Sequence, residues 1–168
     1  MQPTTIYRFL FSVLTLVFLG LTSPAGATEI GHGKNLGIGL NIGFPAGVSA
    51  KYFLSPAHAV QVSAGYWPVG DGIKTAAIDW VAHKQYRLQG KPYTLYAGLG
   101  FGYHRWGAEQ GFNHDLGVDG YGVRVPLGLM KMFDSVPVEA GGELVIGYFG
   151  GATEGFHMDF CAILRVYF

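Results

Sequence analysis

The sequence contains a single cysteine and few charged residues. One cysteine among 168 residues excludes a disulfide within the chain. Lysine and arginine total 11, and aspartate and glutamate also total 11, so the sequence predicts no charge-driven binding of nucleic acid. Charged residues make up 13% of the chain, against about a quarter in typical soluble domains. The composition is therefore not that of an ordinary soluble enzyme, and the length fits one domain.

Glycine and apolar residues are abundant instead. The chain has 27 glycines, 49% hydrophobic residues and 15% aromatic residues. That much apolar surface is enough to offset the conformational entropy lost on folding, so the composition excludes an intrinsically disordered chain.

The first 27 residues have the three parts of a secretory signal peptide. Arg8 gives the start of the chain a positive charge, the run Phe9–Leu21 is mostly apolar, and the segment Ser23–Ala27 ends in an Ala-Gly-Ala cleavage pattern. The alternative is a membrane-spanning helix, but such a helix needs about 20 apolar residues and this run is shorter. We therefore expect a signal peptide over residues 1–27 and an exported mature domain over residues 28–168.

The mature chain alternates between apolar and small or polar residues with a period of two, which is the repeat of a β-strand. The alternation is clearest in Leu36–Phe44, Tyr93–Tyr103, Tyr121–Leu129 and Phe156–Phe168. Turn-forming residues divide the mature chain at seven places. We therefore predict eight strands, over residues 35–44, 47–54, 59–68, 73–88, 93–107, 117–133, 138–149 and 156–168.

The face opposite the apolar one decides between two kinds of barrel. In a soluble barrel the apolar face points inward, whereas a membrane barrel has an apolar exterior and a polar lumen. Here the second face is rich in Gly, Ser, Thr and Gln, with a few charges of both signs. Small residues suit the narrow interior of an eight-stranded barrel. The sequence thus predicts an all-β fold, an eight-stranded antiparallel up-and-down transmembrane β-barrel.

The charged residues on the second face predict a polar network in the lumen. Its expected members are Asp79, His83, Arg87, Arg124, Glu139, Glu143, Asp159 and Arg165. We expect Glu143, Arg124 and Arg165 to lie close together, because the predicted strand 138–149 lies between its two sequence neighbours in an up-and-down meander. A static network would keep buried charges paired, whereas pairs that exchange partners could gate a narrow water path.

Aromatic residues near the strand ends predict two girdles at the membrane interfaces. One expected girdle contains Phe44, Tyr66, Trp67, Tyr103, Trp106, Tyr121, Tyr148 and Phe156, and the other contains Phe53, Tyr93, Phe133, Tyr167 and Phe168. Pro126 removes a backbone donor from its strand, so we expect a bulge there. Cys161 falls on the inward side of the last strand and is expected to be a small buried side chain.

Parts of the sequence resemble known proteins. The alternating run Phe160–Phe168, with a terminal Phe, resembles the carboxy-terminal insertion signal of bacterial outer-membrane barrels, carried here by Phe160, Leu164, Val166 and Phe168. Segments 37–52, 122–129 and 165–168 resemble a family of small, functionally uncharacterised bacterial outer-membrane barrels. The resemblance covers nearly the whole mature chain and implies an eight-stranded barrel of the size of the OmpA transmembrane domain or OmpX. It further implies a location in the bacterial outer membrane, contact with its lipid, and insertion by the barrel-assembly machinery through the last strand.

Candidate catalytic or metal-binding residues are few. His104, His114, Asp115, His157 and Asp159 lie near expected loops or strand ends, but their spacing fits no standard metal-ligand motif. Residues 113–116 do not form the His-x-Ser arrangement seen in outer-membrane lipid deacylases. We predict no enzymatic activity, no catalytic residue, no cofactor and no metal.

The sequence therefore favours a structural or envelope-maintenance protein with a filled lumen. The alternatives are a narrow small-solute pore, a lipid-modifying outer-membrane enzyme, and a soluble periplasmic barrel that binds an apolar ligand. The expected outer connections, over 45–47, 69–72, 108–116 and 150–155, are short, which argues against a large recognition surface. Neither a ligand nor an oligomeric state follows from the sequence.

Overall fold

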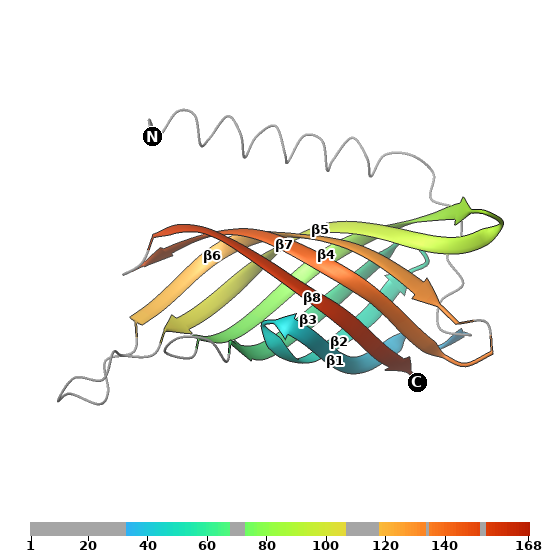
Figure 1. Cartoon of the computed structure of the whole chain (residues 1–168), viewed down its shortest axis with the longest axis horizontal. Coiled ribbons are helices and arrows are strands. Elements are labelled where there is room, and N and C mark those ends of the chain that lie inside the picture. The colour runs from blue at the N-terminus through green and yellow to red at the C-terminus, as the bar shows by residue number, and fades with distance from the viewer. Residues whose placement is uncertain (1–32, 68–72, 107–117, 134, 152–153) are drawn as a thin grey trace.

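Eight antiparallel strands close into a single barrel in the computed structural model, which describes residues 33–67, 73–106, 118–133, 135–151 and 154–168 (Figure 1). The strands are β1 (Leu36–Phe44), β2 (Ala46–Ser55), β3 (His58–Trp67), β4 (Ile73–Leu88), β5 (Lys91–Trp106), β6 (Val118–Met132), β7 (Val138–Gly151) and β8 (Gly155–Tyr167). The predicted eight-stranded, antiparallel, up-and-down barrel is confirmed. The expected signal peptide lies outside the described residues.

The barrel closes where the first strand meets the last. β1 pairs with β8 in one continuous register, from Gly37 opposite Tyr167 to Phe44 opposite Phe160. β1 pairs with β2 on its other side, so neither end of the sheet has a free edge. Closure gives every strand a hydrogen-bonded neighbour on both sides, as lipid requires of strands that cross it.

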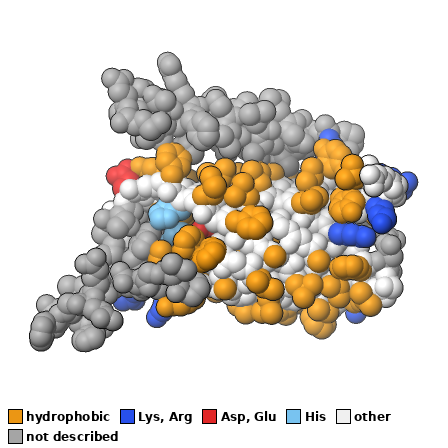
Figure 2. Space-filling model, viewed as in Figure 1, with side chains coloured by type: hydrophobic (Ala, Val, Ile, Leu, Met, Phe, Trp, Pro, Cys, Tyr) orange, Lys and Arg blue, Asp and Glu red, His pale blue; other side chains and the backbone are white. Residues whose placement is uncertain are grey.

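Large apolar side chains cover the outside of the barrel. Exposed examples come from β1–β6 and from β8; Ile42 is 60% exposed, Phe101 68% and Phe160 65%. Figure 2 shows this apolar surface as a broad zone over the middle of the barrel. Within the described ranges, no helix is long and apolar enough to cross a membrane.

Glycines on the inward face make room for a few large aromatic side chains. A methyl group at Gly128 would lie 2.0 Å from the ring of Tyr96, and one at Gly37 would lie 2.6 Å from the ring of Tyr167. The eight-stranded interior is just wide enough for side chains to fill it, so a large ring on one strand requires a missing side chain on its neighbour. This packing explains the glycines that lie against these rings.

Two aromatic residues expected in a membrane-interface girdle lie inside the barrel instead. Phe53 is 2% exposed and Tyr167 is fully buried, and both belong to the buried apolar cluster at one end of the lumen. The expectation was wrong because it followed distance from the strand end and not the alternation of the strand. Tyr52 and Phe168, their neighbours in the sequence, are the residues that face outward.

Pro126 causes no bulge. Its strand keeps one register with β5, because Ala97 pairs with Leu127 and Gly100 with Arg124, and only the two positions between them lack ladder pairs. On the other side Pro126 pairs with Val145 in the continuous register of β7. The missing proline N–H therefore interrupts the ladder on one side only, and no extra residue is needed. The irregularity between β2 and β3 lies instead next to their turn, between Phe53 and Ser55.

Replacing an inward glycine should destabilise the barrel. A methyl group at Gly122 would lie 2.2 Å from the Tyr148 carbonyl oxygen and 2.8 Å from Phe149, and the backbone of a closed sheet cannot move away. We expect Gly122→Ala to lower the free energy of unfolding by about 1–3 kcal/mol, the usual cost of overpacking. Urea titration of the barrel in detergent micelles measures this loss.

Gly142→Ala is the matched control, because the nearest atom to a methyl group at Gly142 is the Cys161 carbonyl oxygen at 3.9 Å. Equal urea midpoints for the two variants would contradict the close packing of the lumen.

Candidate functional site

The interior of the barrel contains most of the expected polar network. Buried there are Asp79, His83, Arg124, Glu139, Glu143, Asp159 and Arg165, each 5% exposed or less. Lys51, which was not expected, is fully buried among them. Six of these side chains, all but His83 and Asp159, form two clusters of ion pairs and hydrogen bonds at different levels of the lumen.

The first, which we call the end cluster, consists of Lys51, Glu139 and Arg165. The Lys51 ammonium lies 3.2 Å from Glu139 Oε1, and an Arg165 guanidinium nitrogen lies 2.8 Å from the same oxygen. The Tyr167 hydroxyl donates to the other carboxylate oxygen of Glu139. Arg165 Nε donates to Ser49 Oγ at 3.0 Å. Two cations thus share one carboxylate, which leaves the end cluster with an excess of one positive charge.

Strand register builds the end cluster. Glu139 on β7 stands directly opposite Arg165 on β8, so their side chains meet on the inward face. Lys51 reaches this pair from β2. Its ammonium also lies 4.3 Å from the centroid of the Tyr96 ring, in a cation–π contact that helps to stabilise the buried charge. The same ammonium lies 3.5 Å from Met130 Sδ.

The second, which we call the middle cluster, consists of Asp79, Arg124 and Glu143, together with Gln61. Arg124 Nε lies 2.9 Å from Asp79 Oδ1, and a terminal guanidinium nitrogen lies 3.6 Å from Glu143 Oε1. Gln61 Nε2 donates to Glu143 Oε2 at 2.7 Å and to Asp79 Oδ2 at 3.3 Å. One cation faces two carboxylates, so the middle cluster carries an excess of one negative charge, opposite to the end cluster.

Tyr96 connects the two clusters. Its hydroxyl donates to Glu143 Oε2 at 2.6 Å, while its ring contacts the Lys51 ammonium. His83 packs against the same ring, with ring centroids 5.4 Å apart. The positive excess of the end cluster and the negative excess of the middle cluster therefore lie within one polar network across the lumen. Asp159 is buried on β8, outside both clusters.

The expected trio of Glu143, Arg124 and Arg165 is only partly present. Arg124 and Glu143 are an ion pair, but Arg165 pairs with Glu139. The difference comes from register, because the residue opposite Glu143 on β8 is Cys161. Cys161 is a free, buried cysteine on the inward side of the barrel.

Arg87 does not face the lumen. It is exposed on the hairpin that joins β4 and β5, where it stands opposite Pro92. β4 and β5 have 16 residues each, against 9 in β1, so this hairpin extends past the end of the barrel wall. Arg87 has the alternation of the inward residues of β4, but at this position there is no lumen for its side chain to enter.

Sequence reasoning missed Lys51, Gln61 and Tyr96. All three had a usable signal, because each alternates with outward residues of its own strand; Lys51, for instance, lies between Ala50 and Tyr52. The alternation on β2 is weaker than on β1, and the exposed positions Val48, Tyr52 and Leu54 would have revealed it.

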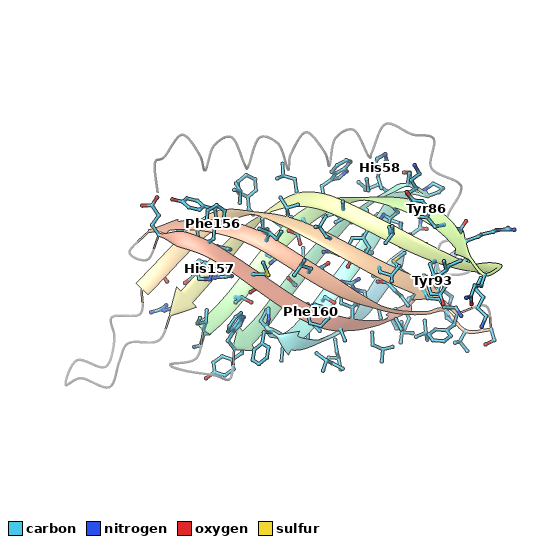
Figure 3. All side chains as sticks on the ribbon, turned by 45° about the horizontal axis from the view of Figure 1, so that its top comes forward. His58, Tyr86, Tyr93, Phe156, His157 and Phe160 are labelled. Carbon is cyan, nitrogen blue, oxygen red and sulfur yellow. The ribbon has the colours of Figure 1, made fainter. Side chains whose placement is uncertain are left out.

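The residues of the expected insertion signal face outward. Phe160, Leu164, Val166 and Phe168 are exposed on or directly after β8, and Figure 3 labels Phe160 on this surface. Their role in insertion stays a prediction.

The stacked rings of His104 and Phe149, 3.9 Å apart, lie beside His157 at the other end of the barrel. In the described part of the chain, no three His, Cys, Asp or Glu side chains group in a way that could hold a metal.

Comparison with known proteins supports the architecture. No protein-family model matches the chain, and no curated protein sequence matches it. The crystal structure of the N-terminal β-barrel domain of OprF from Pseudomonas aeruginosa matches with a TM-score of 0.61 and 15% sequence identity. The match covers 79% of this chain and 96% of that domain. The likeness shows the fold. It confirms the OmpA/OmpX-like eight-stranded barrel that the sequence predicts.

Removing the shared carboxylate should be more damaging than removing one of its cations. Glu139→Gln leaves Lys51 and Arg165 buried without a counter-charge, and an uncompensated buried charge costs about 3–5 kcal/mol. Lys51→Met leaves Glu139 and Arg165 as a balanced pair, so we expect a clearly smaller loss. Urea titration of both variants in detergent micelles measures the difference.

The double variant Glu139→Gln, Lys51→Met should recover part of the stability lost in Glu139→Gln. Glu139→Gln with the stability of the native chain would show that the carboxylate does not neutralise the two cations.

Proposed function

We propose that the chain is an integral β-barrel of the bacterial outer membrane, with a closed lumen and a structural or envelope-maintenance role. The observation that carries the proposal is the inverted distribution of side chains. Apolar residues face outward over most of the barrel, while charged residues are buried inside it. Water would favour the opposite arrangement, and lipid favours this one.

The interior argues against a soluble barrel that binds an apolar ligand. Such a ligand needs a cavity lined mainly by apolar side chains. Here the described interior contains three cations and four carboxylates, most of them joined by ion pairs and hydrogen bonds. An apolar ligand would have to displace those pairs, at a cost of several kcal/mol for each charge left alone.

The packing of the lumen supports a closed barrel and not an open pore. The middle cluster joins side chains from β3, β4, β6 and β7, and the Tyr96 hydroxyl of β5 donates to it. Their burial leaves little of this cross-section open to water. The barrel therefore serves as a membrane-anchored body, exported by the signal peptide expected over 1–27 and inserted through β8.

The location of the mature chain in the cell envelope and its resistance to detergent test this proposal directly. We expect residues 28–168 to be recovered in the outer-membrane fraction and to migrate as a folded band on gels until boiled, because a closed barrel resists detergent. Membrane fractionation followed by electrophoresis of heated and unheated samples makes the measurement. A water-soluble periplasmic monomer would refute the proposal.

Planar-bilayer recording tests whether the middle cluster closes the lumen. The native chain should give no steady conductance, whereas Arg124→Ala with Glu143→Ala removes two side chains that cross the lumen and should produce a measurable current. The matched control is Arg105→Ala with Asp119→Ala, an exposed ion pair 3.9 Å apart on the outside of the barrel. Currents of equal size in the two double variants would contradict a lumen closed by Arg124 and Glu143.

A further inference from the structure

The two ends of the barrel differ in exterior charge. At the end where β1 begins and β8 finishes, Lys84, Arg87 and Lys91 lie on the β4–β5 hairpin and Lys131 lies on β6. We call these four residues the basic surface. Figure 2 shows basic side chains gathered at this end, which is the right-hand end in Figure 1.

No acidic side chain among the described residues balances the basic surface. The described carboxylates are either in the lumen or, as Asp119 and Glu154, exposed at the opposite end. There Asp119 lies 3.9 Å from Arg105, so that end carries both signs. Among the described residues, positive charge therefore dominates one end only.

The basic surface extends over three neighbouring strands, β4, β5 and β6. Lys91 stands opposite Leu88 at the tip of the hairpin, and Arg87 stands opposite Pro92 one position further from the tip. β6 follows β5 around the barrel, with Met130 opposite Thr94, so Lys131 belongs to the same end of the wall. Neighbouring strands lie about 4.8 Å apart. Lys84 stands opposite Leu95, four residues from Lys91 along β5, so the basic surface also extends by about 13 Å along the strands.

Exposed aromatic rings lie close to two of these cations and indicate their depth relative to the membrane. The Lys84 ammonium lies 5.7 Å from the centroid of the Tyr86 ring, and the Lys131 ammonium lies 5.8 Å from that of Phe133. Both rings are at least 40% exposed, and Figure 3 shows Tyr86 and Tyr93 at this end of the barrel. Exposed Tyr and Phe at the edge of an apolar band lie at the lipid–water interface, and lysine side chains extend along apolar surface to place their charge in water. This is the depth of lipid phosphates.

We propose that the basic surface binds the headgroups of anionic phospholipids in the leaflet at that end of the barrel. The proposal rests on the proposed function, because the surface meets headgroups only if the barrel spans a membrane. Several cations with no acidic side chain among their described neighbours attract a phosphodiester that carries a net negative charge more than a zwitterionic headgroup. The opposite end lacks this selectivity because it exposes Asp119 and Glu154 as well as cations.

Spin-labelled lipids test the proposal in vesicles. The mature chain is reconstituted in phosphatidylcholine with a trace of spin-labelled phosphatidylglycerol or phosphatidylcholine, and electron spin resonance gives the association of each with the barrel. We expect the native chain to prefer phosphatidylglycerol by about fivefold or more, the factor that one Lys or Arg contributes near an anionic surface. The variant Lys84→Gln, Arg87→Gln, Lys91→Gln, Lys131→Gln should lose most of this preference, and so should the native chain at high salt.

Lys74→Gln with Arg105→Gln is the control at the opposite end and should keep the preference of the native chain. Heat-modifiable mobility of every sample separates the two proposals. If the barrel folds but shows no preference, or if the fourfold variant keeps the preference, only the proposal of lipid binding is overturned and the proposed function stands. A chain that does not fold into the vesicles overturns the proposed function as well.

Discussion

Closure of the sheet between β1 and β8 is the constraint on which the rest of the structure depends. Eight strands closed in this way leave an interior only as wide as a layer of side chains. Each inward position must therefore be occupied in coordination with its neighbours. Where Tyr96, Phe149 and Tyr167 lie across the lumen, the neighbouring inward positions are glycines. The high glycine content and the large lumen aromatics are two consequences of the same narrow bore.

The bore also explains why the buried charges are arranged in clusters. A charge buried alone costs several kcal/mol. The end cluster has two cations and one carboxylate, and the middle cluster has one cation and two carboxylates. Neither cluster is balanced by itself. Tyr96 contacts both, so the opposite excesses lie close together and offset one another.

Much of this structure is predictable from a sequence period of two. Alternation within strands and turn residues between them give eight strands with nearly correct bounds, and parity places Asp79, Glu139 and Arg165 inside. Parity fails for Arg87, because the alternation continues on the β4–β5 hairpin after the barrel wall has ended. The length of that hairpin relative to β1 is the physical quantity that local patterns do not contain.

Pairing across the lumen is less accessible to sequence reasoning. Arg165 meets Glu139 and not Glu143 because of a register between β7 and β8 that the whole closed sheet determines. Lys51 meets the same carboxylate from β2, although the two residues are 88 positions apart in the sequence. Such contacts depend on how far each strand is shifted along its neighbour around the barrel, and no local signal records the accumulated shift.

The neutral total charge of the sequence conceals a separation of charge in space. In the described residues, four of the six carboxylates are in the lumen, where they are used to pair with Lys51, Arg124 and Arg165 or are buried beside them. The cations of the exterior are therefore left with few acidic neighbours, most clearly at the end with Lys84 and Lys131. A composition with equal numbers of both signs excludes a strong field around an unfolded chain. It does not exclude a strong local field on the outside of a barrel that has most of its described carboxylates in the lumen. This field acts at the level where lipid headgroups would contact the barrel wall.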